Sequence, residues 1–542
     1  MSLPRRSPVF LCLLAAAALA IAGATAPARA ESFDLHFSPF AQAVAEAALG
    51  DDEVAAFYRA NRYQPIWTGA DAGERARLAA LLRALLDAPD HGLPVAAYDT
   101  SEVTGMMRHI ASPRDRGKVE VALTHLFLTY AHDIETGIVE PRSIDPLMTR
   151  NPHRRDGTEL LNAFLAAENP DAFLHSLMPQ SEEYAHLMHK KLELEQQLAR
   201  GGWGPTVNAR KLEPGDRGAA VVALRNRLMA MGYLGRSATM TYDAEILKAV
   251  QEFQTDFGLN ADGVAGPETI KALNVPMEER LKSVIVAMER ERWLRIDRSR
   301  RYVWVNLADF TARIVDDGAI TFETRSVIGM NAADRRTPEF SDEIEHMIIN
   351  PTWHVPRSIV ENEYLPSLIE TAGAAAGHLQ IIDGAGRVVP RESIDWTQVT
   401  AENFPFDLKQ PPSGGNALGR VKFMFPNKHN IYLHDTPSKS LFRRDVRAFS
   451  HGCIRLQKPF EFAYTLLAPQ VDDPVGYFQS ILRTGQETQV DLVEHVPVHL
   501  VYRTAFSDLR GRVSFRNDIY GRDAKIWRAL VEAGVRIPGL ES

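Results

Sequence analysis

The pattern of apolar and polar positions changes part-way along the chain. In the first part, apolar residues recur at helical spacing, most clearly over residues 75–86 and 119–132, which are rich in strong helix formers. From about Arg301 onward, residues such as Val303 and Val305 alternate with Tyr302 and Trp304, and a period of two predicts strands. The sequence therefore predicts an α+β multidomain protein with an all-α scaffold before a mostly-β domain.

Two further features divide the chain more finely. Residues 211–275 contain helix faces separated by turns, including a glycine-rich turn over 262–267, and predict a compact three-helix unit. Residues 361–419 break the strand rhythm and predict an insertion that caps a cleft. The predicted units are a signal peptide (1–30), a helical scaffold (31–205), the three-helix unit (206–276), a β-rich catalytic domain (277–525, with the capping insertion 361–419) and a C-terminal helix (526–542).

The first thirty residues have the features of an export signal. Arg5 and Arg6 precede an apolar run over 9–22, and Ala28-Arg29-Ala30 has the small-x-small form of a cleavage site. We therefore expect the protein to be exported to the periplasm. The alternative is an uncleaved signal, which would hold the protein at a membrane.

Composition excludes one class of partner. Hydrophobic residues make up 45% and charged residues 24% of the 542 positions, which is ordinary for a globular protein. The net charge is −8, and no basic stripe interleaved with aromatic residues is present, which argues against nucleic acid. No heptad run suggests a coiled coil, and we expect a monomer.

Cysteine usage points to a candidate nucleophile. The chain has two cysteines; Cys12 lies in the predicted signal, which leaves Cys453 as a lone thiol in the string Ser450-His451-Gly452-Cys453-Ile454-Arg455. His434 follows a short apolar strand upstream and is expected to act as the base of the thiol, holding it as thiolate near neutral pH.

The neighbours of this pair have plausible supporting roles. The second ring nitrogen of His434 needs an acceptor, and we expect the backbone carbonyl of Asp435 rather than its carboxylate. Backbone amides around His451, Gly452 and Cys453 are expected to form an oxyanion hole, and Arg455 is expected to pair with a substrate carboxylate.

Three other interpretations of the same residues remain. Cys453 could be a buried structural thiol, which is the commonest state of a free cysteine. His434, His451 and Cys453 could bind zinc, although the H-x-C spacing is unusual for that metal. Ser450 could be a hydrolase nucleophile, but the G-x-S-x-G pattern fails because position 448 is alanine.

The three-helix unit resembles the peptidoglycan-binding module found in many cell-wall enzymes. The matching segments are Leu212 to Gly218 (L-x-x-G-D-x-G), Val250 to Gln254, Gly258-Leu259 and Asp262-Gly263-x-x-Gly266. The resemblance implies either binding to peptidoglycan or a purely architectural role.

The segment from His434 to Arg455 (H-D-T…S-H-G-C-I-R) resembles the signature of L,D-transpeptidases with a YkuD-type catalytic domain. Matches at 416–419, 422–423 and 432–437 point to the large, multidomain periplasmic branch of that family (YcbB-like). Small-domain members of the family usually have asparagine where this chain has Arg455, and the large branch tolerates this difference. Through this resemblance, Tyr432, Trp353, Asn416, Ser450 and Arg455 are expected on the substrate side of the site.

The resemblance implies a two-step acyl transfer without a metal or organic cofactor. Cys453 would attack the third residue of a peptidoglycan tetrapeptide stem, release D-alanine and hold a thioester, and an amine from a second stem would complete a 3→3 cross-link. Carbapenem-type β-lactams would trap the same thiol. Two alternatives keep the thioester, with water as acceptor (an L,D-carboxypeptidase) or another amine (exchange or protein anchoring). A third is a non-enzymatic peptidoglycan-binding protein.

Overall fold

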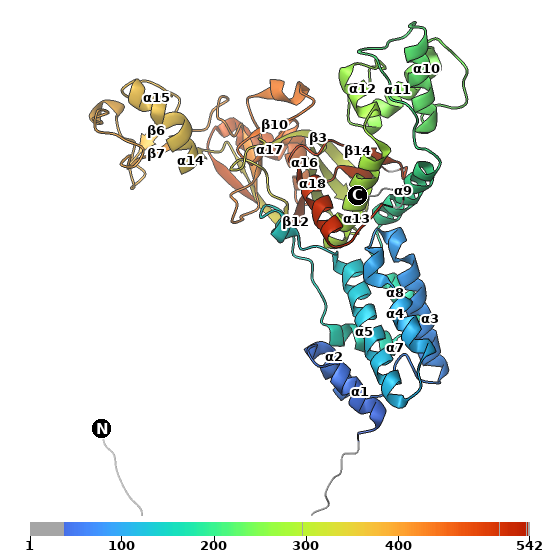
Figure 1. The fold of residues 1–542 in the computed structure, drawn as a ribbon. Helices are drawn as coiled ribbons and strands as arrows, with labels where there is room; N and C mark the ends of the chain where they lie inside the picture. The colour runs from blue at the N-terminus through green and yellow to red at the C-terminus, as the bar shows by residue number, and fades with distance from the viewer. Residues whose placement is uncertain (1–36, 295, 509, 538, 540–542) are drawn as a thin grey trace, which may run out of the picture.

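The computed structural model describes residues 37–294, 296–508, 510–537 and 539. The predicted signal peptide and Cys12 lie outside the described residues. Helices form the N-terminal part and a small unit at one end of the molecule (Figure 1). A large sheet lies beside them, and a smaller body projects from the far side of that sheet. This is the α+β multidomain architecture that the sequence predicts.

The N-terminal part is an all-helical scaffold built around one long helix. That helix, α5, contains the predicted segment 119–132 and packs along α1, while α3 contains the predicted segment 75–86. The helices are α1 (Pro39–Ala47), α2 (Asp52–Ala60), α3 (Ala72–Asp87), α4 (Ser101–Arg108), α5 (Pro113–Thr136), α6 (Pro141–Ile144), α7 (Gly157–Ala166), α8 (Pro170–Leu177) and α9 (Glu182–Ala199), with 3-10 turns at Ala88–His91 and Val95–Tyr98.

The small unit has the three helices expected from the sequence. They are α10 (Ala219–Ala230), α11 (Ala244–Asp256) and α12 (Pro267–Leu273), and their apolar faces share one hydrophobic core with α9 and the next helix, α13 (Met277–Trp293). The sequence pattern did not predict α13, because its buried positions include charged residues. Glu289, Arg290, Glu291 and Arg292 are all buried, so the helix lacks a clear polar face.

The β-rich part is a mixed sheet of nine strands. Its order is β10-β3-β11-β9-β8-β4-β12-β1-β2, and an additional pairing of β2 with β3 closes it. The strands are β1 (Tyr302–Asn306), β2 (Thr311–Asp316), β3 (Ala319–Gly329), β4 (Phe340–Ile349), β8 (Val421–Met424), β9 (Leu433–His434), β10 (Ala448–Ser450), β11 (Ile454–Leu456) and β12 (Thr488–Val501). A turn around Asp317 and Gly318 joins β2 to β3, and β12 is the longest strand of the sheet.

Helices cover this sheet, and a hairpin links it to the helical parts. The apolar face of α16 (Pro459–Leu467) packs with α17 (Pro474–Thr484) into the core of the sheet. The hairpin of β13 (Ala505–Ser507) and β14 (Val513–Phe515) contacts α9 and α13. The C-terminal helix α18 (Arg522–Glu532) packs on α13; it begins before the predicted start at 526 and ends at Glu532.

The predicted capping insertion is a separate small body with its own hydrophobic core, on the side of the sheet away from the scaffold (Figure 1). It contains α14 (Arg357–Ile359), a π-helical turn (Val360–Tyr364), α15 (Leu365–Glu370), a 3-10 turn (Arg391–Ser393) and a sheet in the order β5-β7-β6. Those strands are β5 (Trp353–His354), β6 (Gln380–Ile382) and β7 (Asp407–Gln410). We call residues 353–419 the cap, since its sheet begins at β5, before the predicted start at 361.

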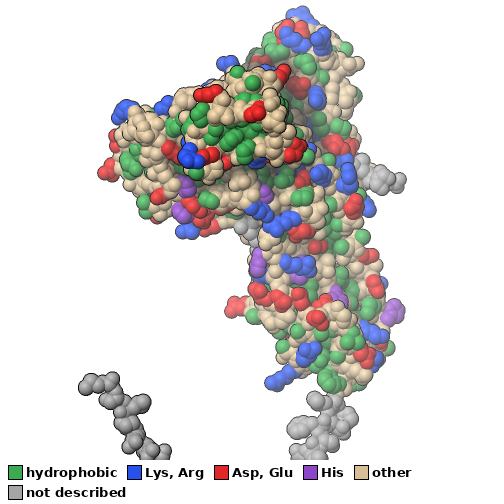
Figure 2. Space-filling model, turned by 90° about the vertical axis from the view of Figure 1, so that its left-hand side faces the viewer, with side chains coloured by type: hydrophobic (Ala, Val, Ile, Leu, Met, Phe, Trp, Pro, Cys, Tyr) green, Lys and Arg blue, Asp and Glu red, His purple; other side chains and the backbone are tan. Residues whose placement is uncertain are grey.

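The molecular surface mixes charges of both signs. On the face shown in Figure 2, acidic and basic side chains are interspersed over the helical part below and the β-rich part above. Among the described helices, none combines the length and the apolar character needed to cross a membrane. The unit boundaries given from the sequence remain predictions.

Candidate active site

The strand register brings the two expected reactive residues to one face of the sheet. β11 runs parallel to β9 with Ile454 beside Leu433 and Arg455 beside His434. Ile454 and Leu433 are fully buried in the core. Since side chains alternate along a strand, His434, Arg455 and the preceding Cys453 share the opposite face.

The neighbouring strand adds a cation to the same face. β8 is antiparallel to β9, and its Lys422 lies opposite His434. The Lys422 ammonium lies 5.7 Å from the ring of Tyr432, and the rings of Tyr432 and His434 meet edge to face at 5.7 Å. Lys422 was not among the site residues expected from sequence, since only the pairing of β8 with β9 brings it here.

His434 is held in one tautomer by the backbone. The ring is buried, and its Nδ1 lies 2.5 Å from the carbonyl oxygen of Asp435, which is the contact expected from the sequence. A carbonyl only accepts, so Nδ1 carries the proton and Nε2 carries the lone pair. The Asp435 carboxylate is engaged elsewhere, because it accepts from the backbone amides of Arg420 and Thr436 and from the Lys439 ammonium.

Burial sets the charge state of the thiol and the imidazole. It raises the pKa of the Cys453 thiol to about 11, although hydrogen bonding from Tyr432 and the charges of Arg455 and Lys422 act in the other direction. Burial, helped by the Arg455 charge, lowers the pKa of His434 to about 3. These pKa shifts run against the expected thiolate at neutral pH, because desolvation favours the neutral form of both groups and outweighs the nearby cations.

The thiol is half-buried and does not contact the imidazole directly. Its hydrogen-bond partner is the carbonyl of Asn430, 3.5 Å from the sulfur. Across the described residues, the structure shows no hydrogen bond between Cys453 and His434. The two side chains share a face one strand apart, diagonal to each other in the register.

His451 faces the cap rather than the thiol. Its Nε2 lies 2.5 Å from a carboxylate oxygen of Glu363, and Arg335 contacts the same oxygen at 3.0 Å. Glu363 lies in the π-helical turn of the cap. No sequence signal marks Glu363 or Arg335, because three segments far apart in the chain meet only in the folded protein.

Two residues expected to contact substrate have other places. Asn416 is fully buried, its amide donates to the carbonyls of Pro351, Gln410 and Pro411, and its oxygen accepts from Leu418 N–H. Ser450 is also buried, and its hydroxyl donates to the carbonyl of Cys453 at 2.5 Å and accepts from Gly452 N–H at 3.2 Å. The polar atoms of both side chains are already bonded to backbone groups, so both residues hold the shape of their loops.

That last contact also corrects the expected role of Gly452. Its N–H is directed at the Ser450 hydroxyl, which leaves it poorly placed as an oxyanion donor. Gly452 has φ +114°, a conformation that disfavours any side chain, so glycine is needed for the shape of the loop.

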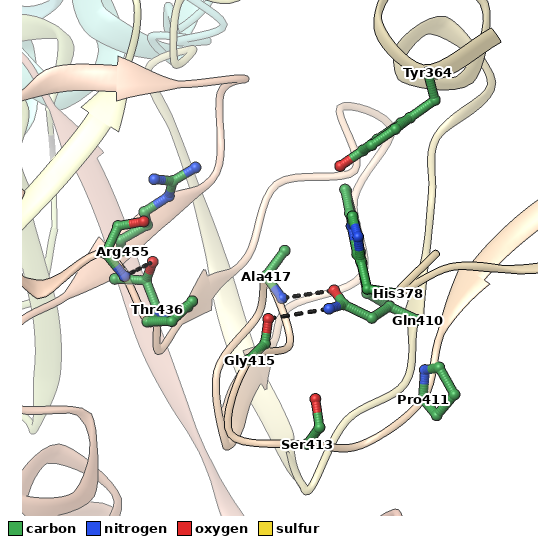
Figure 3. Close-up of a pocket in the computed structure, with 12 residues that line it drawn as sticks. Tyr364, His378, Gln410, Pro411, Ser413, Gly415, Ala417, Thr436 and Arg455 are labelled. Atoms are coloured by element: carbon green, nitrogen blue, oxygen red, sulfur yellow. Dashed lines mark hydrogen bonds between the residues drawn. The ribbon is translucent and has the colours of Figure 1, made fainter. Parts of the chain in front are cut away.

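A pocket of about 600 Å³ opens beside Arg455, between the cap and the catalytic sheet. Arg455 and Thr436 come from the sheet side, while Tyr364 and His378 come from the cap side (Figure 3). Gln410 braces the loop below by bonding to Gly415 and Ala417 (Figure 3). The pocket lining also includes Trp353, Pro411, Ser413, Pro437 and Ser438.

Arg455 has capacity left for a ligand. Its Nε is buried without a hydrogen-bond partner within the described part of the chain. Of the residues expected on the substrate side, Arg455 and Trp353 line the pocket and Tyr432 adjoins the thiol. Among the described residues, no group of three or more His, Cys, Asp and Glu side chains is arranged to hold a metal ion.

Family models match three separate parts of the chain. Residues 300–477 match the model described as "L,D-transpeptidase catalytic domain" (YkuD). This chain carries a YkuD-type L,D-transpeptidase catalytic domain. Residues 217–273 match "Putative peptidoglycan binding domain", and residues 52–190 match "Scaffold domain". The matches agree with the resemblances that the motifs indicate.

A curated relative supports the same family. The chain is 32% identical over 246 residues to a Haemophilus influenzae protein named "Putative L,D-transpeptidase". The match covers 44% of this chain and 48% of that relative, so about half of each protein is compared.

Solved L,D-transpeptidase structures were also matched. Those from Xylanimonas cellulosilytica and Stackebrandtia nassauensis are each 16% identical, cover 55% of this chain and 98% and 96% of their own chains, and have TM-scores of 0.17 and 0.22. Superpositions this weak add nothing to the assignment.

Proposed function

We propose that this protein forms 3→3 peptidoglycan cross-links by acyl transfer through Cys453. The observation that carries the proposal is the shared sheet face of Cys453 and His434, with the Asp435 carbonyl accepting from Nδ1 of His434 so that Nε2 carries the lone pair that takes a proton. The catalytic-domain match supports the reaction class, and the peptidoglycan-binding match supports the polymer on which it acts.

The first step forms a thioester. As Cys453 Sγ bonds to the carbonyl carbon of the third stem residue, its proton passes to His434 Nε2 and the carbonyl electrons move to the oxygen. Collapse of this intermediate breaks the amide bond, and His434 returns the proton to the departing D-alanine amine. Because both groups are neutral at rest, proton transfer accompanies attack rather than preceding it.

The second step transfers the acyl group. The side-chain amine of a second stem attacks the thioester carbonyl, His434 takes its proton, and the thiol leaves with a proton restored. In this proposal the hydrogen bond between thiol and imidazole forms when substrate binds, as catalytic bonds often tighten only in the complex. Arg455 is placed to bind a stem carboxylate from the pocket.

Localisation in the periplasm is part of the proposal, supported by the signal-like residues 1–30. We also propose that the protein acts as a monomer and that carbapenem-type β-lactams acylate Cys453. The three-helix unit is proposed to hold the enzyme on peptidoglycan.

The test is intact-mass detection of the Cys453 thioester with a disaccharide-tetrapeptide, together with product analysis. We expect an adduct lacking D-alanine and 3→3 dimers, both lost in Cys453→Ala. Tripeptide without dimer would show water as acceptor, and persistence of dimers in Cys453→Ala would overturn the proposal.

A further inference from the structure

We propose that Thr337 is a positioning residue that keeps the N–H of Cys453, one of the amides expected from the sequence to form the oxyanion hole, turned toward the reacting carbonyl. The inference rests on the proposed acyl transfer. Thr337 lies at the end of the connection between β3 and β4, and it does not touch the thiol. It precedes the loop Ser450–Cys453, which we call the catalytic loop, by more than a hundred residues. Its effect on the reaction passes through one backbone carbonyl.

The hydroxyl of Thr337 is fully committed. The residue is fully buried, its Oγ1 donates to the carbonyl oxygen of Gly452 at 2.7 Å, and it accepts from the N–H of Gly329 at 2.9 Å. A hydroxyl has a single hydrogen, so the bond to Gly452 uses its only donor. The Gly452 carbonyl is thereby fixed toward Thr337.

Peptide planarity turns this contact into a constraint on Cys453. In a trans peptide, the C=O of one residue and the N–H of the next point in opposite directions. Fixing the Gly452 carbonyl on Thr337 therefore directs the Cys453 N–H away from Thr337. The other polar backbone groups of the loop are held by Ser450, which binds the Gly452 N–H and the Cys453 carbonyl.

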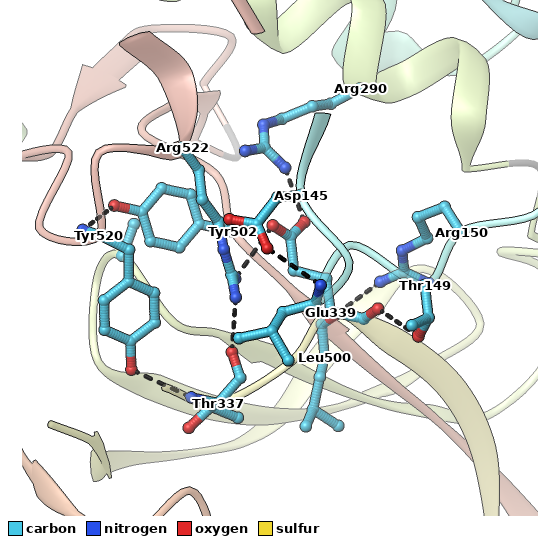
Figure 4. A network of polar contacts seen from close by, with 12 residues as sticks. Asp145, Thr149, Arg150, Arg290, Thr337, Glu339, Leu500, Tyr502, Tyr520 and Arg522 are labelled. Atoms are coloured by element: carbon cyan, nitrogen blue, oxygen red, sulfur yellow. Dashed lines mark hydrogen bonds and ion pairs between the residues drawn. The ribbon is translucent and has the colours of Figure 1, made fainter. Parts of the chain in front are cut away.

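Thr337 is itself held from behind by buried charges. The guanidinium of Arg522 donates to the Thr337 carbonyl at 2.9 Å and to Glu339 at 3.1 Å, and Glu339 also pairs with Arg290 at 2.6 Å (Figure 4). Arg522 has no exposed surface, and Glu339 and Arg290 are buried. The Thr337 backbone therefore has little freedom to move.

Glycine at position 329 permits this close packing. A β-carbon there would lie 2.0 Å from the carbonyl oxygen of Arg335 and 2.7 Å from the nitrogen of Thr337. Because position 329 has no side chain, Thr337 packs directly against the backbone of β3 while its hydroxyl bonds to the carbonyl of Gly452. Ser450 in β10 pairs with Gly329 in β3, so the same end of β3 also supports the catalytic loop.

The size of the effect follows from what an oxyanion donor contributes. Removing one such donor typically slows acyl transfer by about 10²–10³-fold. Loss of the Thr337 hydroxyl leaves the Cys453 amide present but free to turn, so we expect a smaller loss, about 10–100-fold. An SN2 alkylation of the thiol develops no oxyanion and should not respond.

The experiment compares Thr337→Val, which removes the hydroxyl at similar size, with Thr337→Ser, which keeps it. Acylation of Cys453 by a carbapenem is followed by intact mass, and alkylation by iodoacetamide is followed on the same samples. We expect Thr337→Val to acylate about 10–100-fold slower with unchanged alkylation, and Thr337→Ser to match the wild type in both.

Each outcome separates this inference from the proposed function. Wild-type acylation rates in Thr337→Val, or equal losses in both reactions, would overturn the positioning role. If the wild type itself forms no acyl adduct, the proposed function fails instead. Circular dichroism checks folding, and Thr337→Ala is a second variant that removes the hydroxyl.

A measurement that needs no Thr337 variant covers the case in which neither substitution folds. The chain has two cysteines, so selective 15N-cysteine labelling gives at most two amide signals, and Cys453→Ala assigns one of them. We expect the Cys453 amide proton to shift downfield when a carbapenem acylates the thiol, because the acyl oxygen then accepts from it. An unshifted signal in the acylated protein would overturn the inference.

Discussion

The catalytic loop is held in two different ways on its two sides. Behind it, Thr337 and the buried ion pairs of Arg522, Glu339 and Arg290 anchor the loop to β4, α13 and α18 (Figure 4). In front, the cap reaches the loop through His451 and Glu363, whose side chains are about one-third exposed. Buried pairs are costly to break, whereas exposed ones contribute little.

This difference separates two tasks. The buried contacts behind the loop fix the backbone geometry on which the proposed acyl transfer depends, and they do so before any substrate arrives. The contact between His451 and Glu363 joins the cap and the large sheet, which have separate hydrophobic cores. Tyr432, two residues before His434, packs against both cores. A substrate entering the pocket between them needs to disturb only the weaker side.

The strongest way to break the rear is to neutralise Glu339. Glu339→Gln leaves Arg290 and Arg522 without a full counter-charge in a buried site, and removing one partner of such a pair destabilises by about 3–5 kcal/mol. Urea unfolding measures the change. Glu343→Gln, an exposed carboxylate on the adjacent strand, is the control and should change stability by less than about 0.5 kcal/mol. A neutral result at Glu339 would show that the rear is not held by charge.

Acid should lower the stability of the folded protein through the buried His499. Burial lowers the pKa of His499 to about 3, with the charge of Arg150 acting in the same direction. Between about pH 6.5 and 3 the unfolded chain binds a proton that the folded chain refuses, so His499 contributes a loss of stability as pH falls through this window.

The magnitude is at most a few kcal/mol, at about 1.4 kcal/mol per pKa unit. His499→Gln should flatten the dependence of unfolding free energy on pH in this window. Parallel pH curves for wild type and His499→Gln would contradict the buried neutral state.

The thiol should react slowly at neutral pH. With the pKa of Cys453 raised to about 11 by burial, the folded protein holds about 10²-fold less thiolate than a free cysteine of pKa about 8.5. Iodoacetamide labelling should rise with pH up to at least pH 10 without a plateau near 7. The same chain in urea is the reference, and a plateau at neutral pH in the folded protein would show a standing thiolate and imidazolium pair.

The smallest effect is expected at the front. Glu363→Gln removes the charge that meets His451 and Arg335, and exposed pairs of this kind contribute about 0.2–1 kcal/mol. Amide exchange over residues 357–370 should quicken a few-fold, with global stability unchanged. Glu361→Gln, which breaks only a pair with Arg357 inside the cap, is the control. Equal exchange in both variants would place the tie elsewhere.

Local signals carried the predictions that the structure confirms. The helical spacing over 75–86 and 119–132 predicted segments that lie within α3 and α5. The S-H-G-C string and the apolar strand before His434 indicated a thiol and an imidazole whose catalytic roles stay predictions. Where charges replace apolar residues on a buried face, as in α13, the same pattern reasoning found no helix. Asn416 and Ser450 were assigned to substrate because a polar residue in a motif looks alike whether it binds ligand or backbone.

The sequence by itself determined the reactive residue types, their order and the alternation that places them on strands, because these depend on neighbours within a few positions. Only the tertiary structure decided that Thr337 would hold the peptide before Cys453, that Glu363 would meet His451, and that both reactive groups would be neutral. Each of these depends on distant segments meeting and on the loss of water around them, and neither is encoded in local spacing.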